Sequence, residues 1–290
     1  MSTLVENVAK VTAAHAALKE AIAAKGVAVP ENTKLSDMPA LVEQIPSAPA
    51  YTSAANFYAD NGKTSIDVPA TVFVDFTSAA SLYRCFADCA DLTTLTFPVG
   101  FGKAAENLGQ CFIRCGSMTS LTLPDGFGQA ATYIDSCFYG CAKLTSITLP
   151  DGFGQAATDA SRCFQGCAAL RYLMLPAGFG QNATTLYNCF ANNPALTSLT
   201  LPAGFGQNAT NLNVCFRNCS ALAEITGNPS FKVSLSLSPC PNLTHDSLMV
   251  VINGLQTVTT SQTLTLGTAN LAKLTDEEKK VATDKGWTLA

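Results

Sequence analysis

Cysteine is the residue of this chain whose spacing first suggests chemistry. The twelve cysteines include C-F-x-x-C pairs, such as the one from Cys137 to Cys141, which recur in register with a period of 26 residues. Paired thiols are the side chains that bind zinc, form disulfides or carry redox chemistry. In the fifth unit, however, Asn193 stands where the second cysteine is expected, which leaves Cys189 without a local partner. We therefore expect two columns of reduced core thiols, with disulfides or metal binding as the alternative.

Other residues of catalytic type are too few and too scattered to predict an enzyme. The sequence has two histidines, His15 and His245, and no cysteine or carboxylate pattern recurs around either of them. A catalytic triad or a Cys-His pair would need such partners. The repeated G-F-G turns lack the lysine of a phosphate-binding loop. We expect no catalytic residue, no bound metal and no cofactor.

The cysteines belong to a repeat that spans residues 78–228 in six units. Its phenylalanine column is Phe86, Phe112, Phe138, Phe164, Phe190 and Phe216, and its strand column is Leu95, Leu121, Ile147, Leu173, Leu199 and Ile225. A fixed period of this length predicts a solenoid, in which each unit buries its apolar side only by stacking on its neighbours. The expected fold class is a leucine-rich repeat solenoid of 26-residue units with a parallel sheet on one face.

Within a unit, the segment L-T-S-I-T-L has the spacing of a leucine-rich-repeat strand. Successive side chains of a strand point to opposite faces. In the third unit we therefore expect Leu144, Ile147 and Leu149 to point inward and Ser146 and Thr148 to point outward. The G-F-G turn that follows each strand is expected to return a further aromatic side chain to the core.

Composition limits the partners that this protein can have. Charged residues make up 13% of the chain and the net charge is −4, so no basic stripe is available to neutralise the phosphates of a nucleic acid. No apolar run reaches the 18 residues of a membrane span. We also see no secretory signal peptide, because charged residues interrupt the N-terminal segment. We expect neither nucleic-acid binding nor membrane insertion.

The N-terminal segment, residues 1–46, is predicted to be helical. Its apolar residues are spaced as a heptad seam of three repeats: Leu4, Val8, Val11, His15, Leu18 and Ile22. This pattern favours a coiled coil and hence a homo-oligomer, with a trimer as one arrangement. The alternative is a single amphipathic helix that packs on its own chain.

The repeat is expected to carry a cap at each end, because end units face water. Residues 47–77 are predicted to form a linker and a strand-bearing cap, with short apolar runs such as Val72–Val74. Residues 229–290 are predicted to form an α+β cap, with a helix that opens at Thr244 and a strand at Leu264–Leu266. A T-x-x-E capping box at Thr275–Glu278 is expected to open a final helix.

Units such as Cys137–Ile147, with the pattern C-F-x-x-C-x-x-L-T-S-I, resemble those of the BspA-like leucine-rich-repeat proteins, which are bacterial surface and phage-associated proteins. The resemblance covers residues 78–229. Two departures are the cysteine at Cys137, where that family has a small alanine, and the insert Asp151–Gln155, which lengthens the unit. The resemblance implies binding or adhesion and no catalytic residues. The C-terminal section and the run Ala21–Val27 are similar to leucine-rich-repeat tail proteins of gut bacteriophages and prophages, which implies a virion component.

Comparison of the six units shows which columns change most between copies. Variable columns lie just ahead of each C-F pair and inside C-F-x-x-C, and they are rich in residue types that build recognition surfaces. The candidate binding residues in these columns are Tyr83, Arg84, Tyr133, Asp135, Tyr139, Asp159, Arg162, Gln165, Tyr187, Asn188, Asn211, Asn213 and Arg217. The alternative is that unconstrained surface positions simply drift.

A second candidate lies on the outward strand face, where the first, second, third and fifth units carry Ser or Thr. In the fourth unit Arg171, Tyr172 and Met174 replace small polar residues. An apolar and cationic patch on a flat polar face indicates a contact site for a ligand, another protomer or the N-terminal helices.

The leading functional hypothesis is a non-enzymatic protein of the virion, associated with the tail of a bacteriophage or prophage. It would be mounted on other virion proteins through its N-terminal helices and would present the solenoid to a host surface glycan or protein. The alternative is a BspA-like surface adhesin of a gut bacterium whose export signal has been removed. The expected location is therefore the virion tail or an extracellular surface.

Overall fold

The computed structural model describes residues 19–20, 65–67 and 79–290. The chain forms two compact units, Met1–Tyr51 and Thr52–Ala290, and the second contains the solenoid. In the first unit Lys19 and Glu20 are helical. The heptad residues lie outside the described residues, so self-association through them stays a prediction: Leu4, Val8, Val11, His15, Leu18 and Ile22.

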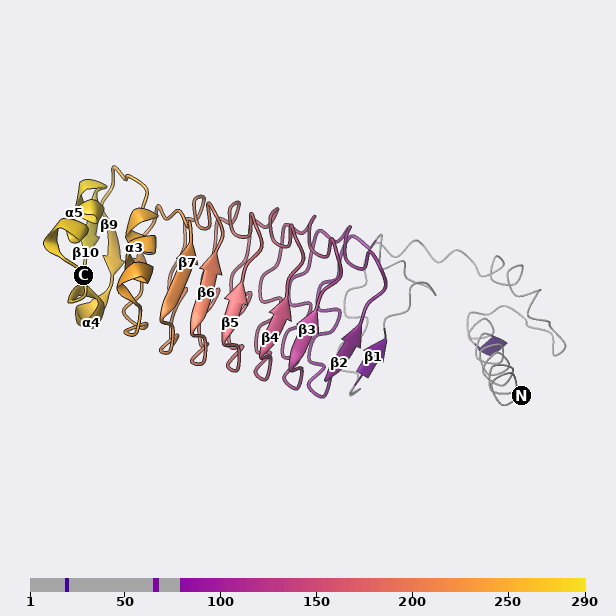
Figure 1. Ribbon diagram of the computed structural model, residues 1–290. Coiled ribbons are helices and arrows are strands. Elements are labelled where there is room, and N and C mark those ends of the chain that lie inside the picture. Colours follow the sequence, from indigo (N-terminus) through magenta and orange to yellow (C-terminus); the bar gives the residue numbers. More distant parts are fainter. Residues whose placement is uncertain (1–18, 21–64, 68–78) are drawn as a thin grey trace, which may run out of the picture. The chain divides into compact units, whose positions relative to one another are not determined.

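Each coil of the solenoid contributes one short strand to a parallel face (Figure 1). The strands are β1 (Ser65–Asp67), β2 (Thr94–Thr96), β3 (Ser120–Thr122), β4 (Ser146–Thr148), β5 (Tyr172–Met174), β6 (Ser198–Leu201) and β7 (Glu224–Gly227). All recorded pairings among them are parallel: β1 with β2, β3 with β4, β5 with β6, and β6 with β7. The predicted leucine-rich repeat solenoid is confirmed.

The strand register follows the sequence period. Leu121 pairs with Ile147, so equivalent residues 26 positions apart lie side by side. Side chains alternate as predicted, because Ser146 and Thr148 of β4 are exposed while Leu144 is fully buried. In the N-terminal cap the described strand is Ser65–Asp67; the run Val72–Val74, which the sequence also indicated, lies outside the described residues.

A second ladder of backbone hydrogen bonds joins the segments that contain the C-F-x-x-C pairs in successive coils. The backbone N–H of Leu82 donates to the carbonyl of Asn107 at 2.8 Å, and that of Phe86 donates to Cys111 at 2.8 Å. The same pairs recur from unit to unit. We call the outward side of these segments the lateral face; it comprises residues 81–89, 107–115, 133–141, 159–167, 185–193 and 211–219.

Two columns of phenylalanine rings fill the core between the two ladders. In the first column Phe86 stacks on Phe112 with ring centroids 5.2 Å apart, and the stacking continues through each unit. The second column comes from the G-F-G turns, as predicted, and begins with Phe101 stacked on Phe127 at 5.9 Å. It ends where Phe231 meets the column edge-on, at 82°.

The glycines of the G-F-G turn are needed for two different reasons. Gly152 has a φ of +79°, which suits the third position of the turn that Phe153 closes by donating to the carbonyl of Pro150. Gly154 also has a positive φ, and a Cβ there would lie 2.6 Å from the ring of Phe179 in the next unit. The second glycine therefore lets successive coils approach closely enough to stack their rings.

All twelve cysteines are buried and unbridged, and the second thiol of the C-F-x-x-C pair has a specific role. The Sγ of Cys141 donates to the carbonyl of Phe112 in the preceding unit at 3.2 Å, and Cys167 donates likewise to Phe138. Asn193 does the same through its side-chain amide, which donates to the carbonyl of Phe164 at 2.9 Å. The position therefore requires a hydrogen-bond donor rather than a thiol.

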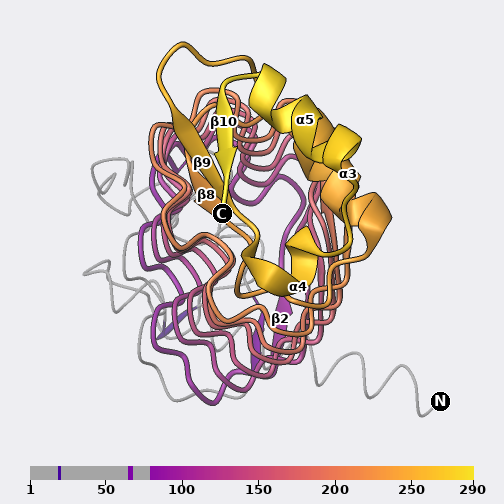
Figure 2. The same cartoon turned by 90° about the vertical axis from the view of Figure 1, so that its left-hand side faces the viewer.

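The C-terminal cap closes the last coil with helices on one side and a small sheet on the other (Figure 2). Its elements are β8 (Leu235–Ser236), α3 (His245–Asn253), β9 (Gln262–Thr265), α4 (Gly267–Leu271), α5 (Asp276–Asp284) and β10 (Trp287–Leu289). The capping box of Thr275 and Glu278 is present at the start of α5, as predicted. Strand β8 and helix α4 were not predicted.

Asn193 provides a test of the donor ladder. Replacing Asn193 with Leu removes the donor and leaves the buried carbonyls of Phe164 and Phe190 without their amide partner, which we expect to cost about 2 kcal/mol. Replacing it with Cys, the residue of the other units, restores a donor and should cost less than half as much. Urea denaturation followed by circular dichroism measures both. Equal losses would show that the hydrogen bond contributes nothing.

The buried thiols predict a loss of stability at alkaline pH. Burial raises the pKa of Cys167 and Cys219 to about 12, and it raises the pKa of Cys111, Cys137 and Cys163 as well. In the unfolded chain thiols ionise near pH ~8.5, so above that pH each one lowers the free energy of unfolding by about 1.4 kcal/mol per pH unit. The stabilisation is complete below that pH and is lost as the pH rises towards 12.

We expect the melting temperature to fall steeply between pH 8 and pH 9.5 in the presence of reductant. This window lies below the usual pKa values of tyrosine and lysine and above that of histidine, so the twelve thiols dominate the titration. A melting temperature that stays constant across the window would contradict buried, protonated cysteines.

Candidate functional site

The lateral face carries all the candidate residues of the variable columns, although they differ in exposure. Tyr133, Arg162, Asn213 and Arg217 are exposed, whereas Asn188 is buried, with 6% of its surface accessible. The remaining candidates are half-buried: Tyr83, Arg84, Asp135, Tyr139, Asp159, Gln165, Tyr187 and Asn211. The structure therefore brings the columns onto one face but presents them to solvent unequally.

The first of the three variable columns ahead of each C-F pair has a local structural role; its residues are Ser81, Asn107, Tyr133, Asp159, Thr185 and Asn211. The side chain of Asp159 accepts a hydrogen bond from the backbone N–H of Ser161 at 2.8 Å, and Asn211 accepts likewise from Asn213. Ser, Thr, Asn and Asp suit such turns because their short side chains reach the backbone two residues ahead. Tyr133 departs from this pattern, and its side chain is 51% exposed. Within this column Tyr133 is therefore the residue that turn chemistry does not explain.

The third variable column lies at a left-handed backbone position in every unit. Its residues have φ between +50° and +56°: Arg84, Gln110, Ser136, Arg162, Asn188 and Val214. Glycine adopts this conformation without strain, whereas other residues pay roughly 1–2 kcal/mol and a β-branched residue such as valine is an outlier. Another left-handed column lies inside C-F-x-x-C, just before the second cysteine position, and this column does use glycine, at Gly140 and Gly166. No glycine occupies the third column in residues 79–290, although glycine would adopt this backbone without strain.

Charges on the lateral face are partly paired. Asp88 forms ion pairs with Arg114 and with Arg84, and the hydrogen bond from Arg114 lowers the pKa of the Asp88 carboxyl. The guanidinium of Arg162 lies over the ring of Tyr187, 4.9 Å from its centroid, which is a cation–π contact. Burial, reinforced by the nearby charge of Asp159, raises the pKa of Asp135.

The lateral face is hollowed by a smaller and a larger groove among the described residues. The smaller, of about 220 Å³, is lined by Gln110, Ile113, Arg114, Ser136, Tyr139 and Arg162. The larger, of about 470 Å³, lies where the solenoid meets the C-terminal cap and is lined by Tyr187, Leu212, Asn213, Val214, Arg217, Ser234, Leu235, Ser236, Thr263 and Thr265. We call the larger one the junction groove. Its volume falls within the range of small-molecule sites.

Sequence comparison of the units missed half of the junction groove. Tyr187, Asn213 and Arg217 were candidates, but the cap contributes the other wall through Ser234, Ser236 and their neighbours on β9. The cap lies outside the repeat, so no column of equivalent residues drew attention to it. The available signal was the alternation S-L-S and T-L-T at residues 234–236 and 263–265, which places hydroxyl groups on one side of two strands.

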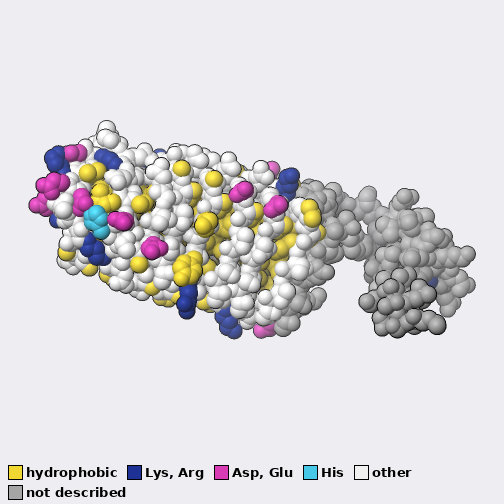
Figure 3. Space-filling model, viewed as in Figure 1, with side chains coloured by type: hydrophobic (Ala, Val, Ile, Leu, Met, Phe, Trp, Pro, Cys, Tyr) yellow, Lys and Arg dark blue, Asp and Glu magenta, His cyan; other side chains and the backbone are white. Residues whose placement is uncertain are grey.

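The patch on the opposite strand face is also present. Tyr172 and Met174 on β5 are 68% and 76% exposed, and Arg171 beside them is exposed too. Figure 3 shows this apolar cluster over β5 on a face that is otherwise largely uncharged. The strand face thus departs from Ser and Thr at this patch and at the exposed Glu224 of β7, whereas the lateral face varies from unit to unit.

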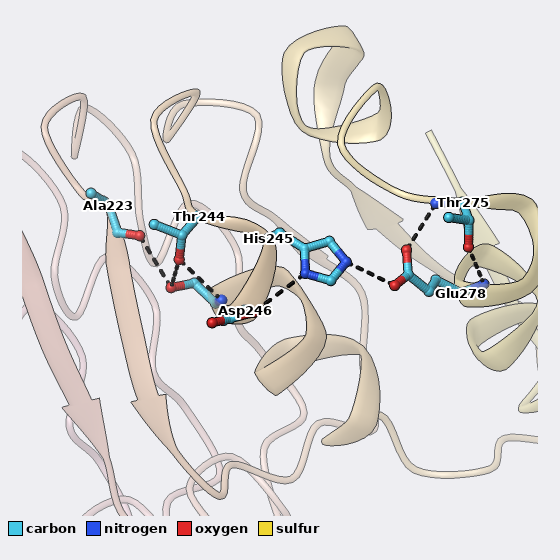
Figure 4. A network of polar contacts seen from close by, with 7 residues as sticks. Ala223, Thr244, His245, Asp246, Thr275 and Glu278 are labelled. Carbon is cyan, nitrogen blue, oxygen red and sulfur yellow. Dashed lines mark hydrogen bonds and ion pairs between the residues drawn. The ribbon is translucent and has the colours of Figure 1, made fainter.

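His245 belongs to a network that joins two helices of the cap rather than to a catalytic group (Figure 4). Its Nε2 lies 2.7 Å from Oε1 of Glu278 at the start of α5, and this hydrogen bond raises the pKa of His245. Nearby, Ser247 is buried and its hydroxyl donates to the carbonyl of Ala223 while accepting from the N–H of Ile225. These bonds attach α3 to strand β7.

The described part of the chain offers little for catalysis or metal binding. Among the described residues no three His, Cys, Asp or Glu side chains form a group that could hold a metal ion. The buried thiols stay protonated at neutral pH because burial raises their pKa, and thiols react as thiolates. Within the same residues, no helix is long and apolar enough to cross a membrane.

Comparison with family models now identifies the repeat. A model described as a BspA type leucine-rich repeat region, in six copies, matches residues 82–179 and 135–245. The chain belongs to the BspA-type leucine-rich repeat family. The predicted family is therefore confirmed, and the matched residues include the entire lateral face beyond its first residue. Comparison with curated proteins gives no significant match.

Solved structures of other leucine-rich repeat proteins are similar to this chain. A leucine-rich repeat protein from Bacteroides ovatus has 17% identity over 70% of this chain and 51% of its own, with a TM-score of 0.40. The T. pallidum leucine-rich repeat protein has 15% identity, coverage of 67% and 84%, and a TM-score of 0.37. A leucine-rich cell surface protein from Faecalibacterium prausnitzii has 14% identity, coverage of 60% and 62%, and a TM-score of 0.28. This chain thus spans about half the length of the Bacteroides protein.

The left-handed column can be tested by a matched pair of substitutions. Ser136 has a φ of +53°, whereas Ser161, in the neighbouring column of the next unit, does not have a positive φ. We expect Ser136→Gly to raise the free energy of unfolding by about 1 kcal/mol and Ser161→Gly to lower it by about 0.5–1 kcal/mol. Urea denaturation measures the difference, and two changes of the same sign would contradict strain at this column.

Proposed function

We propose that this protein is a non-enzymatic attachment protein that binds a host-cell surface through its lateral face. The observation that carries this proposal is the left-handed third column. Glycine would relieve strain at each of its positions, yet the six units keep Arg, Gln, Ser, Arg, Asn and Val there. Drift alone would be expected to admit glycine, as it does in the neighbouring left-handed column at Gly140 and Gly166. Varied side chains maintained against stability support a role in recognition.

The distribution of tyrosine and arginine supports the same conclusion. Across residues 79–290, every tyrosine and every arginine lies either on the lateral face or in the β5 patch of Arg171 and Tyr172. Tyrosine and arginine dominate the binding energy of protein interfaces, whereas lysine is depleted from them. The G-F-G turns and the cap carry lysines instead, such as Lys103 and Lys279. Residue types suited to contact are therefore concentrated on two surfaces.

The proposed carrier is the tail of a bacteriophage or prophage, on which the N-terminal segment would mount the protein as a homo-oligomer beside other virion proteins. The similarity of the N-terminal run Ala21–Val27 and of the C-terminal section to phage tail proteins favours this carrier. The alternative carrier is the surface of a gut bacterium, where the same face would serve an adhesin. In both cases the partner is a surface glycan or protein.

The β5 patch supports a second contact. Tyr172 and Met174 expose a large apolar area on a strand face of hydroxyl-bearing side chains, and such patches on soluble proteins mark interaction sites. We assign this patch to contact with another protomer or with a virion protein, because it is confined to one strand and is not an extended surface.

Cell binding tests the proposal. Fluorescently labelled full-length protein is applied to a panel of gut bacteria and binding is measured by flow cytometry. We expect Tyr133→Ala and Arg162→Ala to weaken binding about tenfold, since exposed tyrosine and arginine are typical hot spots. Thr148→Ala, on the strand face, serves as the control and should leave binding unchanged.

The outcomes separate the two surfaces and the two carriers. Binding that survives both lateral substitutions but is lost in Tyr172→Ala would move the site to the strand face and contradict the proposal, as would an absence of binding across the panel. Antibodies against the protein should label virion tails in electron micrographs if the carrier is a phage. Labelling of bacterial envelopes instead would favour the adhesin.

A further inference from the structure

The junction groove differs from the rest of the lateral face in having two unlike walls. One wall comes from the last two units through Tyr187, Asn213 and Arg217, and the other comes from β8 and β9 of the cap. Leu212 and Leu235 lie at its base and are 1% and 4% exposed. The result is an apolar floor beneath a polar rim, which is the usual construction of a small-molecule site.

The groove has a single charge. Arg217 is its only ionisable cation, and no carboxylate lines it. Arg84 and Arg114 on the same face are engaged by Asp88, whereas the guanidinium of Arg217 has no hydrogen-bond or ion-pair partner among the described residues. An exposed and unpaired arginine beside neutral walls favours one anionic group on the ligand, because arginine binds carboxylates through two parallel hydrogen bonds.

The remaining rim supplies neutral polar groups. Ser234 is already committed, since its hydroxyl lies 2.9 Å from the amide oxygen of Gln262 and accepts from the N–H of Thr263. The side chains of Asn213 and Thr265, by contrast, have no partner within the described residues. Amide and hydroxyl groups both donate and accept, so they match the hydroxyl groups of a sugar.

Tyr187 adds an aromatic wall that is held in place. Its ring carries the guanidinium of Arg162 at 4.9 Å, a contact that restricts the ring before any ligand arrives. A tyrosine combines an apolar ring with a polar hydroxyl, which suits the C–H faces and the hydroxyl groups of a pyranose. Beside it Val214 keeps a φ of +50° and is 39% exposed, so an unfavourable backbone is retained at the groove itself.

We infer that the junction groove binds an acidic sugar, such as a hexuronic or sialic acid unit of a surface glycan, with its carboxylate on Arg217. This inference rests on the proposed attachment function and names the chemistry that one part of the lateral face recognises. A phosphate diester would be matched less well, because a single arginine faces the groove and phosphate sites gather several donors of positive charge. The volume of about 470 Å³ accommodates one or two sugar units rather than an extended peptide.

Matched ligands test the inference with the full-length protein. Isothermal titration calorimetry compares methyl β-D-glucuronide with methyl β-D-glucoside, and sialyllactose with lactose, so that each pair differs in its acidic group. We expect the acidic member of at least one pair to bind about tenfold more tightly, as a charge-assisted bidentate contact provides. Arg217→Gln should remove this preference, and Asn213→Asp, which places a like charge in the groove, should abolish binding of the acidic member.

Two controls test whether the change in affinity is specific to the groove. Lys143→Gln removes one positive charge from an exposed position away from the groove and should leave both affinities unchanged. Circular dichroism establishes that each variant is folded. Equal binding of the neutral sugars, undiminished binding in Arg217→Gln, or equal binding of inorganic phosphate would each overturn the inference.

The failure of this inference is distinguishable from failure of the attachment function. The acidic-sugar site is contradicted, and attachment is not, if the protein binds bacterial cells but none of the acidic sugars. The same holds if Arg217→Gln leaves cell binding unaffected. Binding to neither cells nor sugars would contradict both the acidic-sugar site and the attachment function. Loss of cell binding in Arg217→Gln together with loss of acidic-sugar binding supports both.

Discussion

Stacking of one unit on the next is the interaction on which the rest of this molecule depends. A single coil cannot shield its two phenylalanines or satisfy its inward backbone groups, whereas neighbouring coils do both at once. The buried thiol of Cys141 also bonds to a neighbouring unit, because it donates to the carbonyl of Phe112 in the preceding coil. Any change in the coil must therefore be compatible with two neighbours, which explains why the core columns scarcely vary.

The same constraint makes the outward positions informative. At the third column stacking fixes a left-handed backbone in all six units but does not fix the residue type. Glycine would be less strained there, so the varied residues support the proposed recognition role. Asn193 illustrates the opposite case, because its change of residue type preserves the buried hydrogen bond that the fold requires. Variation at Asn193 is therefore compatible with a structural requirement, whereas variation at the third column is not explained by one. The hydrogen bonds of Asn193 distinguish the two cases.

The sequence period was sufficient to predict the solenoid, its inward strand column and the second phenylalanine column, because equivalent residues must stack. The capping box at Thr275 was also visible, since its two hydrogen bonds are local. The backbone strain at Val214 was not, because no glycine marks the position. The turn bond from the N–H of Ser161 to Asp159 was not visible either, because it depends on a backbone path that residue types alone do not disclose. Strand β8 is two residues long and carries too little pattern to be recognised.

A repeated unit also limits where a distinctive site can form. Successive coils present nearly the same backbone, so grooves between them resemble one another and differ only in side chains. The cap breaks this regularity, because β8 and β9 place hydroxyl-bearing residues opposite the last coil where another unit would otherwise continue. A groove with two unlike walls can therefore arise at the junction and not between interior units. Arg217, which has no acidic partner among the described residues, lies at this junction, whereas Arg114, between interior units, is paired with Asp88. The end of the repeat, rather than its middle, is where the solenoid can hold a single defined ligand.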